Sequence, residues 1–103
     1  MKNLREALLT VAQEQENAKG RTVELWTANH NLLKLLKTPG PVYRRLPDGR
    51  RRNIKFLSLI RVDALLRRKG ILSERFPMED LLQWLRDNWV TILKVLLTLL
   101  ALI

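Results

Sequence analysis

The chain has 103 residues, a formal net charge of +9 and a hydrophobic content of 47%, with only four Gly and four Pro residues. This composition excludes collagen-like, low-complexity and wholly disordered chains, and the short length excludes a large enzyme core. The absence of Cys and the single His exclude a disulfide framework and a metal site built from several thiolates or imidazoles of one chain. We therefore expect one small domain that holds no metal and no cofactor.

Residues 1–37 predict one long amphipathic helix, because they contain no proline and are rich in Leu, Ala, Glu, Gln and Lys. Alternating spacings of four and three place polar residues (Gln15, Thr22 and Asn29) between leucines, as in coiled coils that fix their register. We expect this helix to form oligomers. The apolar seam for oligomerisation consists of Leu4, Val11, Ala18, Leu25 and Leu32. Two alternatives are a helical hairpin broken near Gly20 and one long helix that packs on the rest of the chain.

Residues 38–56 predict a Pro/Gly-rich link followed by a small basic β-hairpin. Two prolines and a glycine within residues 38–41 end the preceding helix. Residues 47–49 read Pro-Asp-Gly between two extended segments, and these three residue types favour a tight turn. The alternative is a disordered basic loop.

The positive charge is concentrated in the middle of the chain, where residues 44–75 contain eleven basic and three acidic residues. Guanidinium groups bind phosphate in a bidentate geometry, so this region predicts contact with nucleic acid or with anionic lipid head groups. An acidic protein is a further candidate partner, and a loop that only keeps the protein soluble is the alternative. The candidate anion-binding residues are Arg44, Arg45, Arg50, Arg51, Arg52, Arg67, Arg68 and Lys69.

Residues 57–76 belong to a second predicted helix and the turn after it. This helix begins at Asn53 or Ile54 and ends at Lys69, because Gly70 suits the position that follows a helix. The three basic residues just before Gly70 suit the negative end of the helix dipole.

Residues 77–103 predict a hydrophobic C-terminal helix that is a candidate membrane anchor. It begins near Pro77, and Glu79 and Asp80 complement its positive end. Twelve of the fifteen residues from Trp89 to Ile103 are apolar, although fifteen helical residues span only about 22 Å of a hydrocarbon core about 30 Å thick. Trp84 would join Trp89 at the membrane interface, where aromatic side chains are enriched.

Polar residues form a narrow stripe on this C-terminal helix. With Gln83, the stripe contains Asp87, Thr91, Lys94 and Thr98. Three states fit: a helix that lies in the membrane surface, a tail anchor in which Lys94 snorkels or pairs with Asp87, and several spanning copies whose stripes line a polar lumen. The alternative is a helix buried in the core of a soluble oligomer, because a monomer of this size is expected to lack the apolar surface to cover it.

Together these segments predict a mainly α fold with a long N-terminal helix, a small basic β-hairpin or loop, and a helical hairpin that ends in the hydrophobic helix. No catalytic set can be assembled, since His30 stands alone and no Gly-rich phosphate loop is present. We therefore expect a membrane-associated structural or interaction protein that is not an enzyme, with residues 1–76 in the cytoplasm. The alternatives are a small pore-forming protein and a soluble viral or phage assembly or nucleic-acid-binding protein, located in the cytoplasm or within a virion.

Overall fold

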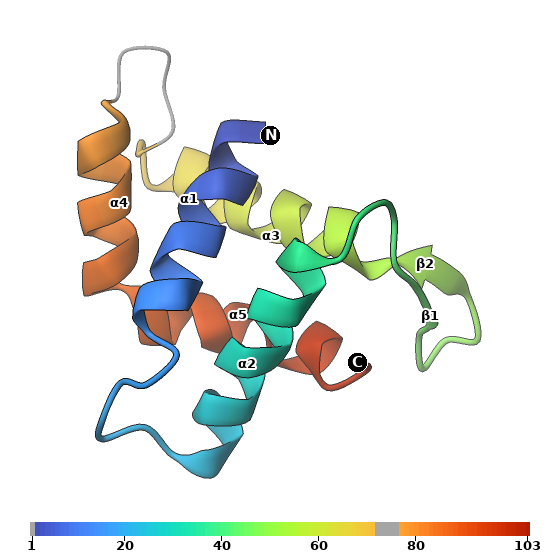
Figure 1. The fold of residues 1–103 in the computed structure, drawn as a ribbon. Helices are drawn as coiled ribbons and strands as arrows, with labels where there is room; N and C mark the ends of the chain where they lie inside the picture. Colours follow the sequence, from blue (N-terminus) through green and yellow to red (C-terminus); the bar gives the residue numbers. More distant parts are fainter. Residues whose placement is uncertain (1, 72–76) are drawn as a thin grey trace.

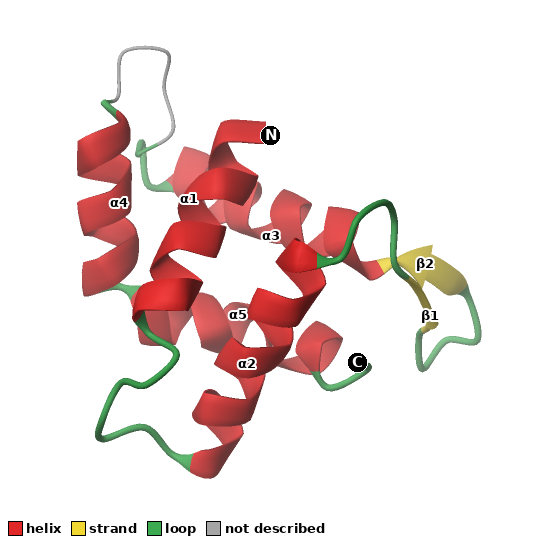
Figure 2. Cartoon of the chain, viewed as in Figure 1, coloured by secondary structure: helices red, strands yellow, loops and turns green. Residues whose placement is uncertain are grey.

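A computed structural model describes residues 2–71 and 77–103 of the chain. Within these residues the protein forms five α-helices and one two-stranded antiparallel sheet, which confirms the predicted mainly α fold with a small hairpin (Figures 1 and 2). The elements in chain order are α1 (Lys2–Glu14), α2 (Val23–Lys37), β1 (Tyr43–Arg45), β2 (Arg51–Asn53), α3 (Ile54–Arg68), α4 (Met78–Asp87) and α5 (Trp89–Leu100).

The single helix predicted for residues 1–37 is wrong, and the helical hairpin broken near Gly20 is observed instead. Helix α1 ends at Glu14, and Gly20 has a φ of 79°, which a continuous helix does not allow. Thr22 then begins α2 as its N-cap, because its hydroxyl accepts a hydrogen bond of 3.2 Å from the backbone N–H of Leu25. The break lets α1 fold back on α2, so that their apolar faces cover each other.

Most of the predicted oligomerisation seam is buried within one chain. Leu4, Val11 and Leu32 are buried in the core of the protein, while Ala18 and Leu25 are half-buried. The three buried side chains are not available to a second chain in this fold. Self-association through other surfaces stays a prediction.

Helix α5 is the centre of the core, where it packs against α2 and α3 (Figure 1). Its buried residues are Trp89, Ile92, Leu93, Leu96, Leu99 and Leu100. The sequence-based expectation that one chain lacks the surface to cover this helix is therefore wrong. The predicted continuous C-terminal helix is also interrupted, because Asn88 separates α4 from α5 with φ −119° and ψ 22°.

The polar stripe faces the outside of the folded chain. Its residues are all exposed: Gln83, Asp87, Thr91, Lys94 and Thr98. The stripe is thus the outward side of two consecutive amphipathic helices, α4 and α5, whose other sides face the core. Among the helices of residues 2–71 and 77–103, we find none with the length and apolar character needed to cross a membrane, so the predicted spanning helix is not supported.

Trp89 lies in the core and not at an interface with lipid. Its side chain is 1% exposed, and its indole Nε1–H donates a hydrogen bond of 2.6 Å to Oδ1 of the buried Asn29. Asn29 in turn donates from Nδ2 to the carbonyl of Ala12 and to Oε2 of Glu16, both at 3.1 Å. The polar seam residue Asn29 therefore serves to join α1, α2 and α5 within one chain. Trp84, the other predicted interfacial aromatic residue, is half-buried.

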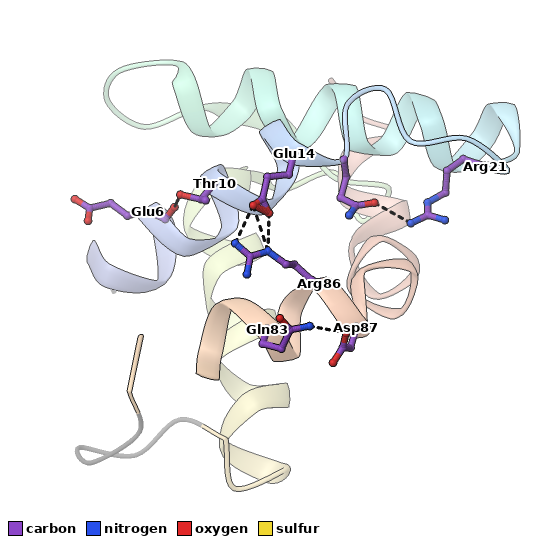
Figure 3. Close-up of polar contacts among 8 residues, drawn as sticks. Glu6, Thr10, Glu14, Arg21, Gln83, Arg86 and Asp87 are labelled. Atoms are coloured by element: carbon purple, nitrogen blue, oxygen red, sulfur yellow. Dashed lines mark hydrogen bonds and ion pairs between the residues drawn. The ribbon is translucent and has the colours of Figure 1, made fainter. Parts of the chain in front are cut away.

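An ion pair closes the corner between α1 and α4 (Figure 3). Arg86 donates from Nε and Nη2 to the two carboxylate oxygens of Glu14, at 2.7 and 2.8 Å. These hydrogen bonds hold the pKa of Glu14 below its ordinary value and raise the pKa of Arg86. Beside them, the amide of Gln83 donates to the Asp87 carboxylate at 2.9 Å, so this carboxylate also has a hydrogen-bond partner within the fold.

Candidate functional site

The predicted basic hairpin is present and projects from the helical bundle (Figure 1). We call residues 43–53 the arginine hairpin. Its turn is closed by two local hydrogen bonds: Asp48 Oδ1 accepts from the backbone N–H of Arg50 at 2.9 Å, and the N–H of Gly49 donates to the Leu46 carbonyl at 2.9 Å. Gly49 has a φ of 86°, which explains why glycine ends this three-residue loop.

The base of the hairpin is fixed to α3 by Asn53. This residue is the last of β2 and the N-cap of α3, because its Oδ1 accepts a hydrogen bond of 3.2 Å from the N–H of Phe56. The same oxygen accepts from the N–H of Val42 at 3.4 Å, and the N–H of Ile54 donates to the Val42 carbonyl at 2.8 Å. Ile54 is fully buried, so the strand enters the core where the helix begins.

Lys55 fixes the link that precedes the hairpin. Its Nζ donates to the carbonyl oxygens of Thr38 and Gly40, just after the end of α2. Burial of the ammonium group and, secondarily, the charge of Arg5 lower the pKa of Lys55. Together with Asn53, this lysine ties both ends of the hairpin to the bundle, so the arginines sit on an anchored support.

The register of the strands gives the hairpin two different faces. Arg44 lies opposite Arg52 and Arg45 opposite Arg51, and side chains alternate between the faces of a strand pair. We call the face that carries Tyr43, Arg45 and Arg51 the open face. The other face carries Arg44 and Arg52.

Leu46 continues the face of Arg44 and Arg52 toward the turn. It is half-buried and packs against the core, where it shares a hollow with Leu99 and Leu102 at the C-terminal end of the chain. The face of Arg44 and Arg52 is therefore in contact with the bundle near the turn. Of the described hydrophobic residues that pack against the core, none belongs to the open face.

The charges of the hairpin are not compensated within the described residues. Its five arginines are all exposed, and the ion pairs of residues 2–71 and 77–103 involve other groups. Like charges directly opposite each other destabilise a strand pair, and this ribbon carries two such pairs. The carboxylate of Asp48, the one acidic residue between residues 43 and 53, is engaged in the turn. The guanidinium groups of Arg44 and Arg45 donate to backbone carbonyls of the hairpin, each at 2.8 Å.

Two exposed aromatic side chains accompany these arginines. Tyr43 is 46% exposed and Phe56 is 48% exposed. The guanidinium carbon of Arg51 lies 5.6 Å from the centroid of the Tyr43 ring, within the range of a cation–π contact. Phe56 was not among the residues predicted from the sequence to contact a ligand. The signal for it was helical periodicity, because Phe56 lies on the side of α3 nearly opposite the buried Ile54.

The remaining predicted anion-binding residues lie elsewhere. Arg67, Arg68 and Lys69 are exposed at the far end of α3, about 20 Å from its start. Arg67 also forms an ion pair with Asp63, with 2.8 Å between Nε and Oδ2. The structure therefore brings the five hairpin arginines together but does not bring these three basic residues to them.

His30 forms a surface pair and no recognisable catalytic group. Its Nδ1 lies 2.7 Å from Oε1 of Glu16, and the ring of Trp26 stacks on it with centroids 5.7 Å apart. In the part of the chain that the structure describes, no group of three or more His, Cys, Asp or Glu residues is arranged to hold a metal ion.

Comparison of the chain with protein-family models, with curated proteins and with solved structures finds no match. The geometry of the arginine hairpin is thus the basis for the functional argument.

Proposed function

We propose that this protein binds nucleic acid and that the arginine hairpin is its contact surface. The observation that supports this proposal is the two pairs of directly opposed arginines on an exposed, anchored ribbon. Their mutual repulsion opposes folding of the hairpin, so the arrangement is not explained by stability. Phosphate groups placed along the ribbon would neutralise the repulsion and accept bidentate hydrogen bonds from the guanidinium groups.

The tip of the hairpin favours nucleic acid over a lipid surface. Proteins that enter a membrane interface bury apolar side chains in it, but the turn residues Pro47, Asp48 and Gly49 carry no large apolar side chain. Leu46, the nearest such residue, is turned toward the bundle.

The test compares two variants that lose the same charge from different places. In the hairpin variant, Arg44, Arg45, Arg50, Arg51 and Arg52 are each replaced by Gln. In the matched variant, exposed basic residues outside the hairpin and outside the other candidate anion-binding residues are replaced by Gln: Lys2, Lys19, Lys34, Lys37 and Lys94. Binding of the full chain to a labelled oligonucleotide is measured by fluorescence anisotropy over a series of salt concentrations.

We expect the hairpin variant to lose about 100-fold or more in affinity at low salt and the matched variant to lose much less. The log–log salt slope of the hairpin variant should fall by about 0.7–0.9 for each phosphate contact that is removed. Equal losses in both variants would mean that only net charge matters. Binding to anionic vesicles but not to oligonucleotides would overturn the proposal in favour of the membrane prediction.

A further inference from the structure

We infer that the open face of the arginine hairpin takes single-stranded nucleic acid, with unpaired bases stacked on Tyr43 and Phe56. This inference rests on the proposed function and specifies its ligand. It joins two independent features, namely the direction in which the hairpin is open and the position of two exposed aromatic rings.

The first feature is that the two faces of the hairpin are not equivalent. Leu46 reaches back to the core near Leu99 and Leu102, which places the bundle on the side of Arg44 and Arg52. A long polymer therefore approaches the opposite side with the least obstruction. That side presents Arg45 and Arg51 as a directly opposed pair of phosphate ligands.

The second feature is the presence of two exposed aromatic residues, Tyr43 and Phe56, near the base of the hairpin. Tyr43 lies directly opposite Asn53 in the strand pair, and Asn53 Oδ1 bonds to the backbone N–H of Phe56 at 3.2 Å. Tyr43 and Phe56 therefore flank the same junction between β2 and α3. Each of the two residues exposes nearly half of its surface.

Aromatic rings beside arginines suit a strand whose bases are free. Every nucleobase has a π-face, so stacking on a protein ring needs no particular sequence. Within a duplex the bases stack on one another, and only their edges are reachable from the grooves. Rings on the surface would then contribute little, whereas on a single strand each stacked base adds to affinity.

The arginine Arg51 links the two kinds of contact. Its guanidinium lies over the Tyr43 ring at 5.6 Å, so its cation is held beside the place where a base would stack. A phosphate bound by Arg51 would bring its attached nucleotide next to that ring. This coupling predicts that arginine and aromatic variants weaken binding in distinguishable ways.

The first experiment compares one labelled sequence as a single strand and as a duplex, each titrated with the full chain at the same salt concentration. We expect tighter binding to the single strand. Equal or tighter binding to the duplex would overturn the inference. Loss of that binding in the hairpin variant would still support the proposed function, so the two failures are distinguishable.

The second experiment removes the rings one at a time. We expect Tyr43→Ala and Phe56→Ala each to lower single-strand affinity by about 5- to 150-fold while the salt slope is unchanged. Tyr43→Phe should restore binding, because it keeps the π-face. Trp26→Ala is the matched control, since Trp26 is 49% exposed but lies on α2, away from the hairpin. Circular dichroism establishes that each variant remains folded. Unchanged affinity in folded Tyr43→Ala and Phe56→Ala variants would contradict the stacking role.

The third experiment compares two variants that each lose one arginine pair, and therefore the same positive charge. Replacing Arg45 and Arg51 with Gln should reduce the single-strand salt slope by about 1.4, which is the value for two lost phosphate contacts. Replacing Arg44 and Arg52 with Gln should reduce the slope by less, because that side is directed toward the bundle. A larger loss from Arg44 and Arg52 would assign the ligand to the opposite face and overturn the inference.

Discussion

The corner formed by α1, α4 and α5 and the arginine hairpin use the same kinds of side chain in opposite ways. At the corner, Trp89 is buried and hydrogen-bonded, and Arg86 is paired with Glu14. At the hairpin, Tyr43 is exposed and arginines face arginines. Aromatic and cationic side chains at the corner are paired with groups of other elements, whereas those at the hairpin are exposed and, in the described part of the chain, make contacts only within the hairpin.

This difference indicates where substitutions should affect folding and where they should affect binding. A side chain whose contacts lie within the chain contributes to the free energy of unfolding when it is removed. Removal of a side chain without such contacts leaves the free energy of unfolding nearly unchanged or increases it.

The largest effect is expected for Trp89→Ala. This substitution removes a fully buried side chain and should lower the free energy of unfolding by about 3–5 kcal/mol. Tyr43→Ala on the hairpin is the comparison and should cost less than about 1 kcal/mol, because exposed sites tolerate truncation. Urea denaturation followed by circular dichroism measures both. Similar costs in the two variants would remove the distinction between the regions.

A smaller loss is expected for Asn29→Ala. It leaves the buried Nε1–H of Trp89 without its acceptor, which should cost about 1–3 kcal/mol. Asn17→Ala serves as the control, because Asn17 is exposed in the loop between α1 and α2. If both variants unfold at the same urea concentration, the buried hydrogen bond does not stabilise the corner.

A stabilising effect is expected for Arg52→Glu in the hairpin. The substitution converts the repulsion with Arg44 into an attraction and should raise the free energy of unfolding by about 0.2–1 kcal/mol. Nucleic-acid affinity should fall in the same variant, because the hairpin loses one positive charge and gains one negative charge. A loss of stability together with unchanged affinity would show that Arg52 serves the fold and not a ligand.

The smallest effect is expected at the ion pair of Glu14 and Arg86, whose side chains are 38% and 37% exposed and therefore screened by solvent. Arg86 holds the pKa of Glu14 below its ordinary value of 4.5 in the folded state. The stabilisation by this carboxylate is thus present above pH 4.5 and is lost as the pH falls through its folded pKa. Glu14→Gln should lower the melting temperature slightly at neutral pH and make it less dependent on pH below 4.5. An equally steep acid dependence in the variant would assign that dependence to other groups.

The sequence predicted those parts of the fold that depend on chemistry within a few residues. Residues 47–49 form the predicted turn, α3 begins at Ile54 as expected, and Gly70 adopts a φ of 72° where the helix was expected to end. In each case a proline, a capping side chain or a glycine restricts the backbone locally, so neighbouring residues suffice. The hairpin that carries the exposed arginines was likewise predicted from neighbouring residues.

The tertiary structure decided which apolar surfaces cover each other. The sequence left the break near Gly20 as one of several alternatives and did not predict the break at Asn88, since the same stripe fits a coiled coil, a hairpin or a membrane helix. The apolar run after Trp89 is covered by α2 and α3, which are distant in sequence, and this is why its length and hydropathy suggested lipid instead. The open face of the hairpin and the exposed Phe56 beside it were likewise identified only from the fold. The alternation of arginines leaves the two faces of the hairpin equivalent, and the packing of Leu46 against the core distinguishes them.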